Sequence, residues 1–285
     1  MAPDIKPVVL SAAAFEKIAP EEFYKRFVQN NVRPDGRSLE RFRPTSLQIN
    51  SVTTANGSAV VRLGNTMVVC GIKAEVAEPR ADAPNLGYIV PNVELAPICS
   101  PQFKAGPPGE LSQAIGHQLN RILDLGKVLK LDQLCIEEHQ AVWCLYADVT
   151  CLTYEGNILD AALLALMAAL THMRLPQATL NEDTGVVTTS LTDDSTPLVI
   201  DRPVYAATFA MFPDQVLLAD PTDTEEAIAE ALVSVVLDDQ GRQCCIWTHG
   251  TQPQDYTRCT ERLLTLAQQR TTTLQSLVTA NAPQS

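Results

Sequence analysis

The chain has 285 residues, of which 46% are hydrophobic and 19% are charged, and its formal net charge is −12 at pH 7. This composition excludes an intrinsically disordered chain and predicts an ordered protein, built as one large domain or two small ones. A free-standing nucleic-acid binder needs a basic face to neutralise phosphates. The acidic balance therefore requires that any nucleic-acid contact be local or shared with more basic partner chains.

Eight cysteines lie mostly within apolar runs, and none shows a Cys-x-x-Cys spacing. We expect reduced, buried thiols in an intracellular protein, with no metal site and no cofactor. The N-terminus lacks the basic-then-apolar pattern of a secretory signal, and the longest apolar run, 161–170, is too short to span a bilayer. The sequence predicts a soluble protein without a membrane anchor.

The first half of the chain alternates strand-like and helical segments. A leader at 1–14 precedes one predicted amphipathic helix around Pro20. Asn-Gly and Gly-Asn separate three runs rich in Val, Ile and Thr, which predicts a β-meander at 46–54, 58–63 and 66–74. The elements expected next are a strand at 87–95, a helix at 112–130, strands at 134–136 and 141–152, and a buried helix at 159–173.

The second half repeats this order. It is expected to contain strands at 179–191, 198–200, 206–211 and 216–219, an acidic link at 222–229, a hairpin of 232–237 with 243–248, and a helix at 255–279. Groups of strands, each followed by a long helix, predict an α+β fold with two similar β-sheet and helix halves.

Two motifs carry a family resemblance. Arg33-Pro-Asp-Gly-Arg37, followed by Gly57-Ser-Ala-Val-Val-Arg-Leu-Gly-Asn-Thr66, resembles the opening of the RNase PH family, which comprises phosphorolytic 3′→5′ exoribonucleases and ring subunits of the RNA exosome. The resemblance implies the RNase PH-like fold, which is similar to domain 2 of ribosomal protein S5. It implies a leader and helix at 1–30, a first RNase PH domain at 31–176, and a second domain with a C-terminal helix at 177–285.

Phosphorolysis needs Arg and hydroxyl donors for phosphate, a cation held by carboxylates, and an acid for the leaving oxygen. In active members of the family, a Gly-Gly-Thr-Arg-like loop before the buried helix holds the phosphate. The corresponding loop here keeps Gly156, but Ile158 and Leu159 stand where the hydroxyl and the guanidinium are expected. Neither side chain can donate a hydrogen bond to phosphate.

Active members also carry two aspartates, six residues apart, before the last hairpin. Glu226 and Leu232 occupy these positions here, so one carboxyl group remains and the other position is apolar. The resemblance therefore implies a ring subunit without catalytic residues, and the stretches 82–95 and 103–110 are most similar to one non-catalytic subunit type. A displaced acidic pair drawn from Asp220, Asp223 and Glu225 is the alternative, and it would make the chain an active phosphate-dependent exoribonuclease.

The resemblance also implies partners. These are other RNase PH-like ring subunits, cap proteins with S1 and KH domains, and single-stranded RNA in a central channel, in the nucleus with its nucleolus and in the cytoplasm. Lys104 is the candidate RNA contact and Arg80 the weaker one, with solubilising surface charges as the competing interpretation. Arg33 and Arg37 flank a turn that we expect to be held by salt bridges. A generic two-half domain that binds something else is the third hypothesis.

Overall fold

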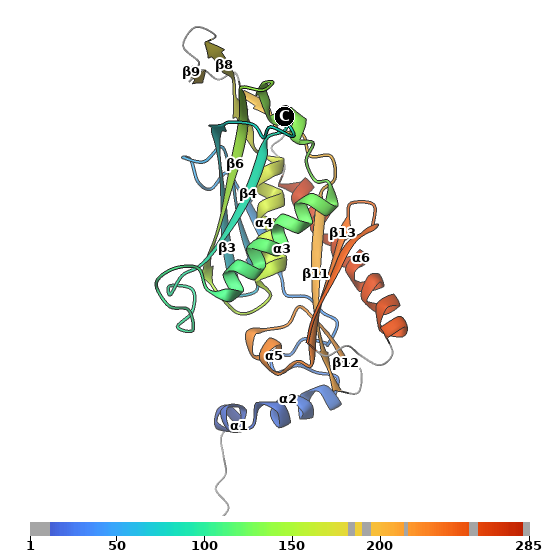
Figure 1. Cartoon of the computed structure of the whole chain (residues 1–285). Helices are drawn as coiled ribbons and strands as arrows, with labels where there is room; N and C mark the ends of the chain where they lie inside the picture. The colour runs from blue at the N-terminus through green and yellow to red at the C-terminus, as the bar shows by residue number, and fades with distance from the viewer. Residues whose placement is uncertain (1–11, 182–185, 190–194, 214–215, 251–255, 282–285) are drawn as a thin grey trace, which may run out of the picture.

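The computed structural model describes residues 12–181, 186–189, 195–213, 216–250 and 256–281. Two β-sheets face each other in this structure, and one helix lies between them (Figure 1). Further helices cover the outer sides, and a pair of N-terminal helices projects from one end.

Two short helices open the described chain where one was predicted. They are α1 (Ala12–Ile18) and α2 (Pro20–Gln29), and Ala19 between them has an extended φ of −140°. Phe15 and Phe23 pack edge to face with ring centroids 6.0 Å apart, which fixes the two helices against each other. Most of the predicted leader lies outside the described residues.

The larger sheet contains six strands. Its order is β1 (Thr45–Ile49), β2 (Gly57–Leu63), β3 (Thr66–Ala77), β6 (Ala141–Thr153) and β4 (Tyr88–Leu95), with β5 (Cys135–Glu137) also paired to β6. The predicted meander is confirmed as β1 to β3. Residues 141–145 of β6 are all buried, and from Tyr146 onward buried positions alternate with more exposed ones. Helix α3 (Glu110–Gly126) packs on β4.

The helix between the two sheets is α4 (Ile158–Thr171), and every residue from Ile158 to Leu170 is buried. It contacts β2 and β3 of the larger sheet and β11 of the smaller one. A helix covered on both sides needs no polar face, which explains its apolar sequence. Its N-terminus consequently lies at the junction of the two sheets.

The smaller sheet has the order β12 (Val216–Ala219), β11 (Val204–Phe212), β13 (Ala231–Asp238) and β14 (Gln243–Gly250). The final helix, α6 (Tyr256–Ala280), packs on β11 and β13 through Leu263, Leu266 and Ala267. The remaining elements are η1 (Leu131–Leu134) and the pairs β7 (Arg174–Pro176) with β10 (Ser195–Pro197) and β8 (Ala178–Asn181) with β9 (Val186–Thr189).

Four further local predictions are wrong. The single strand expected at 179–191 is replaced by two strands, because β8 (Ala178–Asn181) pairs antiparallel with β9 (Val186–Thr189). The expected strand at 198–200 is absent, because residues 195–197 pair with β7 instead and Ile200 forms an isolated bridge with Leu129. The acidic link at 222–229 is a helix, α5 (Asp223–Ile228), whose start is stabilised by the Glu225 carboxyl group accepting the Thr222 N–H at 2.8 Å. The first strand ends at Ile49, because Asn50 takes a left-handed φ of 52°.

Seven cysteines belong to the described part of the chain, and all seven are free thiols. Burial was predicted for all of them, but only Cys70, Cys99, Cys144 and Cys151 are buried, while Cys135, Cys244 and Cys245 are partly exposed. The side chain of Cys259 lies outside the described residues. Among the helices that the structure describes, none combines the length and the apolar character needed to cross a membrane.

Candidate functional site at the N-terminus of α4

The loop that joins β6 to α4 is the segment in which family members would hold phosphate. Gly156 has a φ of 78° and Asn157 a φ of 52°, so both lie in the left-handed region. A Cβ atom on Gly156 would lie 2.5 Å from the Asp223 nitrogen and 2.6 Å from the carbonyl carbon of Thr222. Glycine is required here because the chain that starts α5 crosses directly over the loop.

The two positions predicted to have lost phosphate donors belong to the hydrophobic core. Ile158 is 5% exposed and Leu159 is 7% exposed, and both pack in the main apolar cluster. Their side chains stabilise the first turn of α4 between the sheets. The loop therefore offers an anion no side-chain donor from these two residues.

Glu226, the retained carboxyl group, contacts this loop directly. Its Oε1 accepts the Asn157 backbone N–H at 2.7 Å, and its Oε2 accepts the Tyr154 hydroxyl at 3.1 Å. Burial raises the pKa of Glu226 to about 7, although hydrogen bonds from Asn157 and Tyr154 lower it. Leu232 lies on β13 opposite Ala210 and is partly buried in a small apolar cluster.

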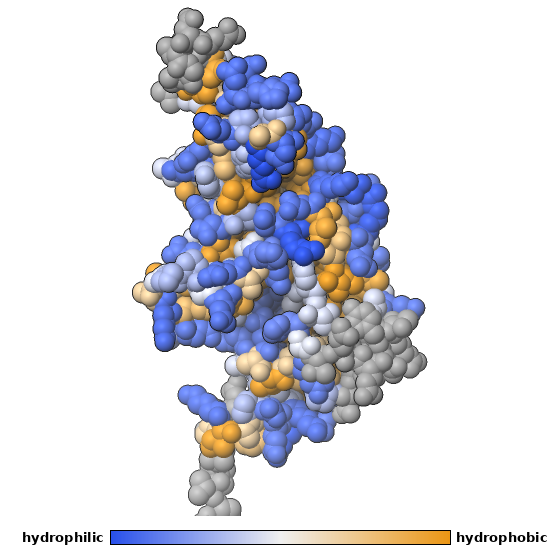
Figure 2. All heavy atoms as spheres, viewed as in Figure 1, coloured by the Kyte–Doolittle hydropathy of each residue, from blue (hydrophilic) through white to orange (hydrophobic). Residues whose placement is uncertain are grey.

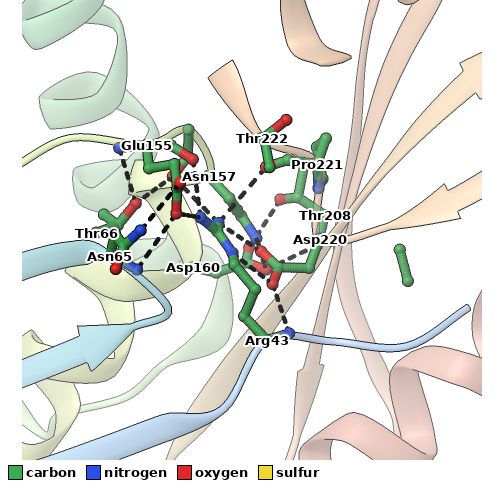
Figure 3. Close-up of polar contacts among 12 residues, drawn as sticks. Arg43, Asn65, Thr66, Glu155, Asn157, Asp160, Thr208, Asp220, Pro221 and Thr222 are labelled. Atoms are coloured by element: carbon green, nitrogen blue, oxygen red, sulfur yellow. Dashed lines mark hydrogen bonds and ion pairs between the residues drawn. The ribbon is translucent and has the colours of Figure 1, made fainter. Parts of the chain in front are cut away.

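An ion pair that the sequence did not reveal lies beside the loop. Arg43 donates from Nε and Nη2 to the two carboxylate oxygens of Asp220, each at 2.8 Å, and from Nη1 to the Glu155 carbonyl oxygen at 2.8 Å (Figure 3). Burial raises the pKa of Asp220, but the hydrogen bonds and charge of Arg43 outweigh it and hold the pKa below its usual range. Both partners are therefore charged at neutral pH.

The same network reaches the smaller sheet. Asn157 donates from Nδ2 to Asp160 at 2.9 Å and to Asp220 at 2.7 Å. The Thr208 hydroxyl and backbone N–H on β11 donate to Asp160 at 2.7 and 2.9 Å. We call these six residues the junction cluster: Arg43, Glu155, Asn157, Asp160, Thr208 and Asp220. It links the first turn of α4 to the chain before β1 and to both strands of the β11–β12 pair, at the end where Thr208 lies opposite Asp220.

The turn at Arg33-Pro-Asp-Gly-Arg37 is structural, as predicted. Arg33 is 1% exposed and forms a buried ion pair with Glu225, and its Nη1 donates to the Ala219 carbonyl oxygen at 2.6 Å. Arg37 pairs with Asp35 and also reaches Asp220 at 3.3 Å. Arg33, Arg37 and Arg43 are thus each paired with carboxylates of the same chain.

The acidic residues considered for a displaced catalytic pair have other roles. Asp220 and Glu225 are bound by Arg43 and Arg33, while Asp223 is exposed and accepts the Thr224 N–H at 2.9 Å. Within the described ranges, no group of three or more His, Cys, Asp or Glu side chains is placed to hold a metal ion.

The predicted RNA contacts lie elsewhere and are exposed. Lys104 belongs to the loop between β4 and α3. Arg80 stacks on Tyr88, with its guanidinium carbon 5.2 Å from the ring centroid, and lines a groove of about 570 Å³ between β4 and α3. This groove shares no residue with the junction cluster.

Comparisons with known proteins agree with this architecture. Residues 41–176 match domain 1 of the 3′ exoribonuclease family, and residues 202–261 match domain 2. The chain is 42% identical to exosome complex component rrp43 of Schizosaccharomyces pombe, over 82% of this chain and 86% of that protein. It is 36% identical to exosome complex component Rrp42 of Methanothermobacter thermautotrophicus, over 79% of this chain and 82% of that protein.

A solved structure is also similar. A chain of the Archaeoglobus fulgidus exosome with RNA bound to the active site superposes with a TM-score of 0.79 and 28% identity, covering 90% of this chain and 96% of that chain. The predicted α+β fold with two sheet-and-helix halves is confirmed. The sequence matches and the shared architecture show that the chain belongs to the RNase PH, or 3′ exoribonuclease, family.

Proposed function

We propose that this chain is a non-catalytic subunit of an RNA exosome core ring. Its role is to help assemble the ring and to guide RNA through it for 3′→5′ processing and degradation. The similarity to rrp43 and to archaeal exosome chains supports this assignment. Residues 82–95 and 103–110 resemble the subunit type called exosome component eight, which we propose for this chain.

The main support for a non-catalytic role is that the protein's own side chains already bind the groups at the α4 loop that a phosphate would need. A helix N-terminus attracts a phosphate through its free N–H groups, and a nearby guanidinium completes the site. Here Glu226 accepts the Asn157 N–H, and Asp220 neutralises Arg43. An incoming phosphate would have to displace one carboxyl group and would face the charges of Glu155 and Asp220.

One observation favours the alternative, an active phosphorolytic exoribonuclease. Burial raises the pKa of Glu226 to about 7, and a carboxylic acid with such a pKa is suited to protonate a leaving oxygen. Against this alternative, Arg33, Arg37 and Arg43 are all paired with carboxylates. Arg62, which lines a pocket with Tyr154 and Glu155, is an exposed cation left to hold a phosphate, and Glu155 and Asp223 line the same pocket.

The test is phosphate-dependent release of nucleoside diphosphates from single-stranded RNA by the purified chain and by the reconstituted ring. Glu226→Gln is the informative variant, because it removes the acid, while the new amide oxygen can accept the Asn157 N–H and the new amide N–H can donate to the Tyr154 hydroxyl. Changes at Asp220 or Glu225 would also break buried ion pairs. We expect no release by the chain alone and an unchanged rate for a ring carrying E226Q. Release by the chain alone that E226Q abolishes would make it an enzyme.

The remaining assignments follow from ring membership. We propose RNA backbone contacts at Lys104 and Arg80, cap proteins with S1 and KH domains as further partners, and a location in the nucleus, nucleolus and cytoplasm. We also propose an N-terminal leader and helix at 1–30 and a boundary between two RNase PH domains at 176/177, after β7, which is compatible with the separate matches to 41–176 and 202–261.

A further inference from the structure

A groove of about 430 Å³ lies between α2 and the elements around the β11–β12 turn. Its floor is apolar and is built by Val28, Phe212, Val216 and Ile228. These side chains belong to a small cluster separate from the main core. Figure 2 shows apolar surface beside α5, next to the N-terminal helices and bordered by hydrophilic residues.

The rim of this groove is acidic. Glu21, Glu22 and Glu230 face a single ammonium group, that of Lys25, and all four side chains are exposed. Among the described residues, none of the four has an ion-pair partner. Glu21 and Glu22 lie in the first turn of α2, where acidic side chains stabilise a helix. This local effect does not explain why Glu230 lies on the same rim or why the apolar floor is open. We call the eight residues Glu21, Glu22, Lys25, Val28, Phe212, Val216, Ile228 and Glu230 the acidic groove.

We propose that the acidic groove binds a basic segment of a partner chain that carries an apolar anchor. The anchor enters over Val28 and Ile228, and Lys or Arg side chains beside it pair with Glu21, Glu22 and Glu230. Charge complementarity selects this occupant, because an acidic segment would meet three carboxylates and an uncharged one would leave them unpaired. This inference rests on the proposed function, since the partner is a ring or cap chain.

The first experiment maps the occupant in a ring reconstituted from purified chains. A photo-crosslinking amino acid replaces Gln29 in the groove, with Gln140, which is exposed on a turn before β6, as the matched control position. We expect Gln29 to crosslink to a partner peptide that holds Lys or Arg beside an apolar residue. Crosslinks to an acidic or uncharged peptide, or to this chain itself, would overturn the proposal, as would a yield equal to that of the control.

The second experiment changes the charge of the rim. E21K/E22K should weaken incorporation into the ring about tenfold and flatten its salt dependence, whereas K25E should strengthen incorporation several-fold, about one extra favourable pair. E137K/E138K reverses two adjacent exposed carboxylates on another surface and should have no effect. Unchanged incorporation of all three variants would refute the groove and leave the ring assignment intact. A wild-type chain that never enters the ring would refute both.

Discussion

The junction cluster and the acidic groove are both rich in carboxylates, but the carboxylates differ in burial and in pairing. In the junction cluster, Asp220 is fully buried and is bound by Arg43 and Asn157 of the same chain. In the acidic groove, three carboxylates are exposed and have no cation among the described residues except Lys25 nearby. The short helix α5 joins the two regions, because Glu226 accepts the N–H of Asn157 in the first and Ile228 lines the second.

This difference indicates two roles for acidic residues in this member of the RNase PH family, one in the stability of the fold and one in binding a partner chain. A carboxylate that is ion-paired inside the chain stabilises the fold, as Asp220 does with Arg43. A charge left unsatisfied beside an apolar floor is available to another chain. Substitutions of a buried, ion-paired residue and of a matched exposed residue test this division.

The largest effect is expected from Arg43→Met. Removal of the guanidinium leaves the buried carboxylate of Asp220 without its counter-charge, which should lower the free energy of unfolding by about 3–5 kcal/mol. Urea unfolding at pH 7 measures this value. Arg62→Met is the control, because Arg62 is exposed and its Nε donates at 2.9 Å to the Gly64 carbonyl oxygen alone.

The pH dependence provides a second readout of the same pair. Because Asp220 has a lowered pKa in the folded state, its stabilising contribution is present above the unfolded pKa of about 4 and is lost as the pH falls further. R43M should flatten this acid-side loss, and R43M/D220N should recover part of the stability at pH 7. A cost below about 1 kcal/mol for R43M would show that the pair is not a structural element.

The second prediction compares two glycines with nearly the same backbone conformation. Gly156 has a φ of 78° and Gly36 a φ of 81°, but a Cβ on Gly36 would meet no atom within 4 Å. Gly36→Ala should therefore cost about 1 kcal/mol from backbone strain alone, and Gly156→Ala about 3 kcal/mol because the added methyl group also strikes α5. Equal costs in thermal or urea unfolding would contradict the tight crossing of α5 over the loop.

The sequence predicted the parts of the site that depend on local pattern. Asn-Gly and Gly-Asn turns marked the meander, and the apolar run of α4 marked a buried helix. The loss of a phosphate site at Ile158 and Leu159, with Glu226 as the remaining carboxyl group, stays a prediction. Each of these features is encoded within about twenty residues, so a linear comparison suffices.

The parts that escaped prediction depend on contacts between distant segments. Arg43 and Asp220 are 177 residues apart, and no local pattern distinguishes Arg43 from other arginines. Helix α5 has six residues, too few for an apolar period, so its acidic sequence indicated a link. The apolar run at 198–200 resembled a strand, but Pro197 and Pro203 on either side limit its pairing.

The third prediction concerns Glu226, which is neither ion-paired like the buried Asp220 nor exposed like the carboxylates of the acidic groove. Its folded pKa of about 7 exceeds the unfolded value of about 4.3, so the unfolded state ionises first and stability should fall as the pH rises between these values. Glu226→Gln should remove this decline and stabilise the protein by about 3–4 kcal/mol at pH 8, with little change at pH 4. Glu230→Gln, exposed on the acidic groove, should leave the free energy of unfolding unchanged at both pH values. A destabilising E226Q at pH 8 would mean that the ionised carboxylate is needed at the α4 loop.

The smallest effects are expected at Lys104 and Arg80, whose exposed charges should act on RNA and not on the fold. In a reconstituted ring, each change to Ala should weaken the binding of single-stranded RNA by about 0.5–1 kcal/mol and reduce the salt dependence by about 0.7 of a unit for each phosphate that is no longer neutralised. Filter binding at several salt concentrations measures both quantities. Lys73→Ala removes an exposed charge on β3 and serves as the control.

Arg80 allows a finer separation, because its guanidinium also stacks on Tyr88. Arg80→Lys retains the charge and weakens the stacking, so it should preserve most of the RNA affinity if the contact is to a phosphate. The salt dependence could instead fall equally in K104A, R80A and the control K73A. In that case the ring attracts RNA through its overall electrostatic field, and Lys104 and Arg80 make no specific contact. If neither K104A nor R80A changes the salt dependence of RNA binding, these two charges serve solubility. The exposed carboxylates of the acidic groove would then bind a partner, whereas the exposed cations Lys104 and Arg80 would not.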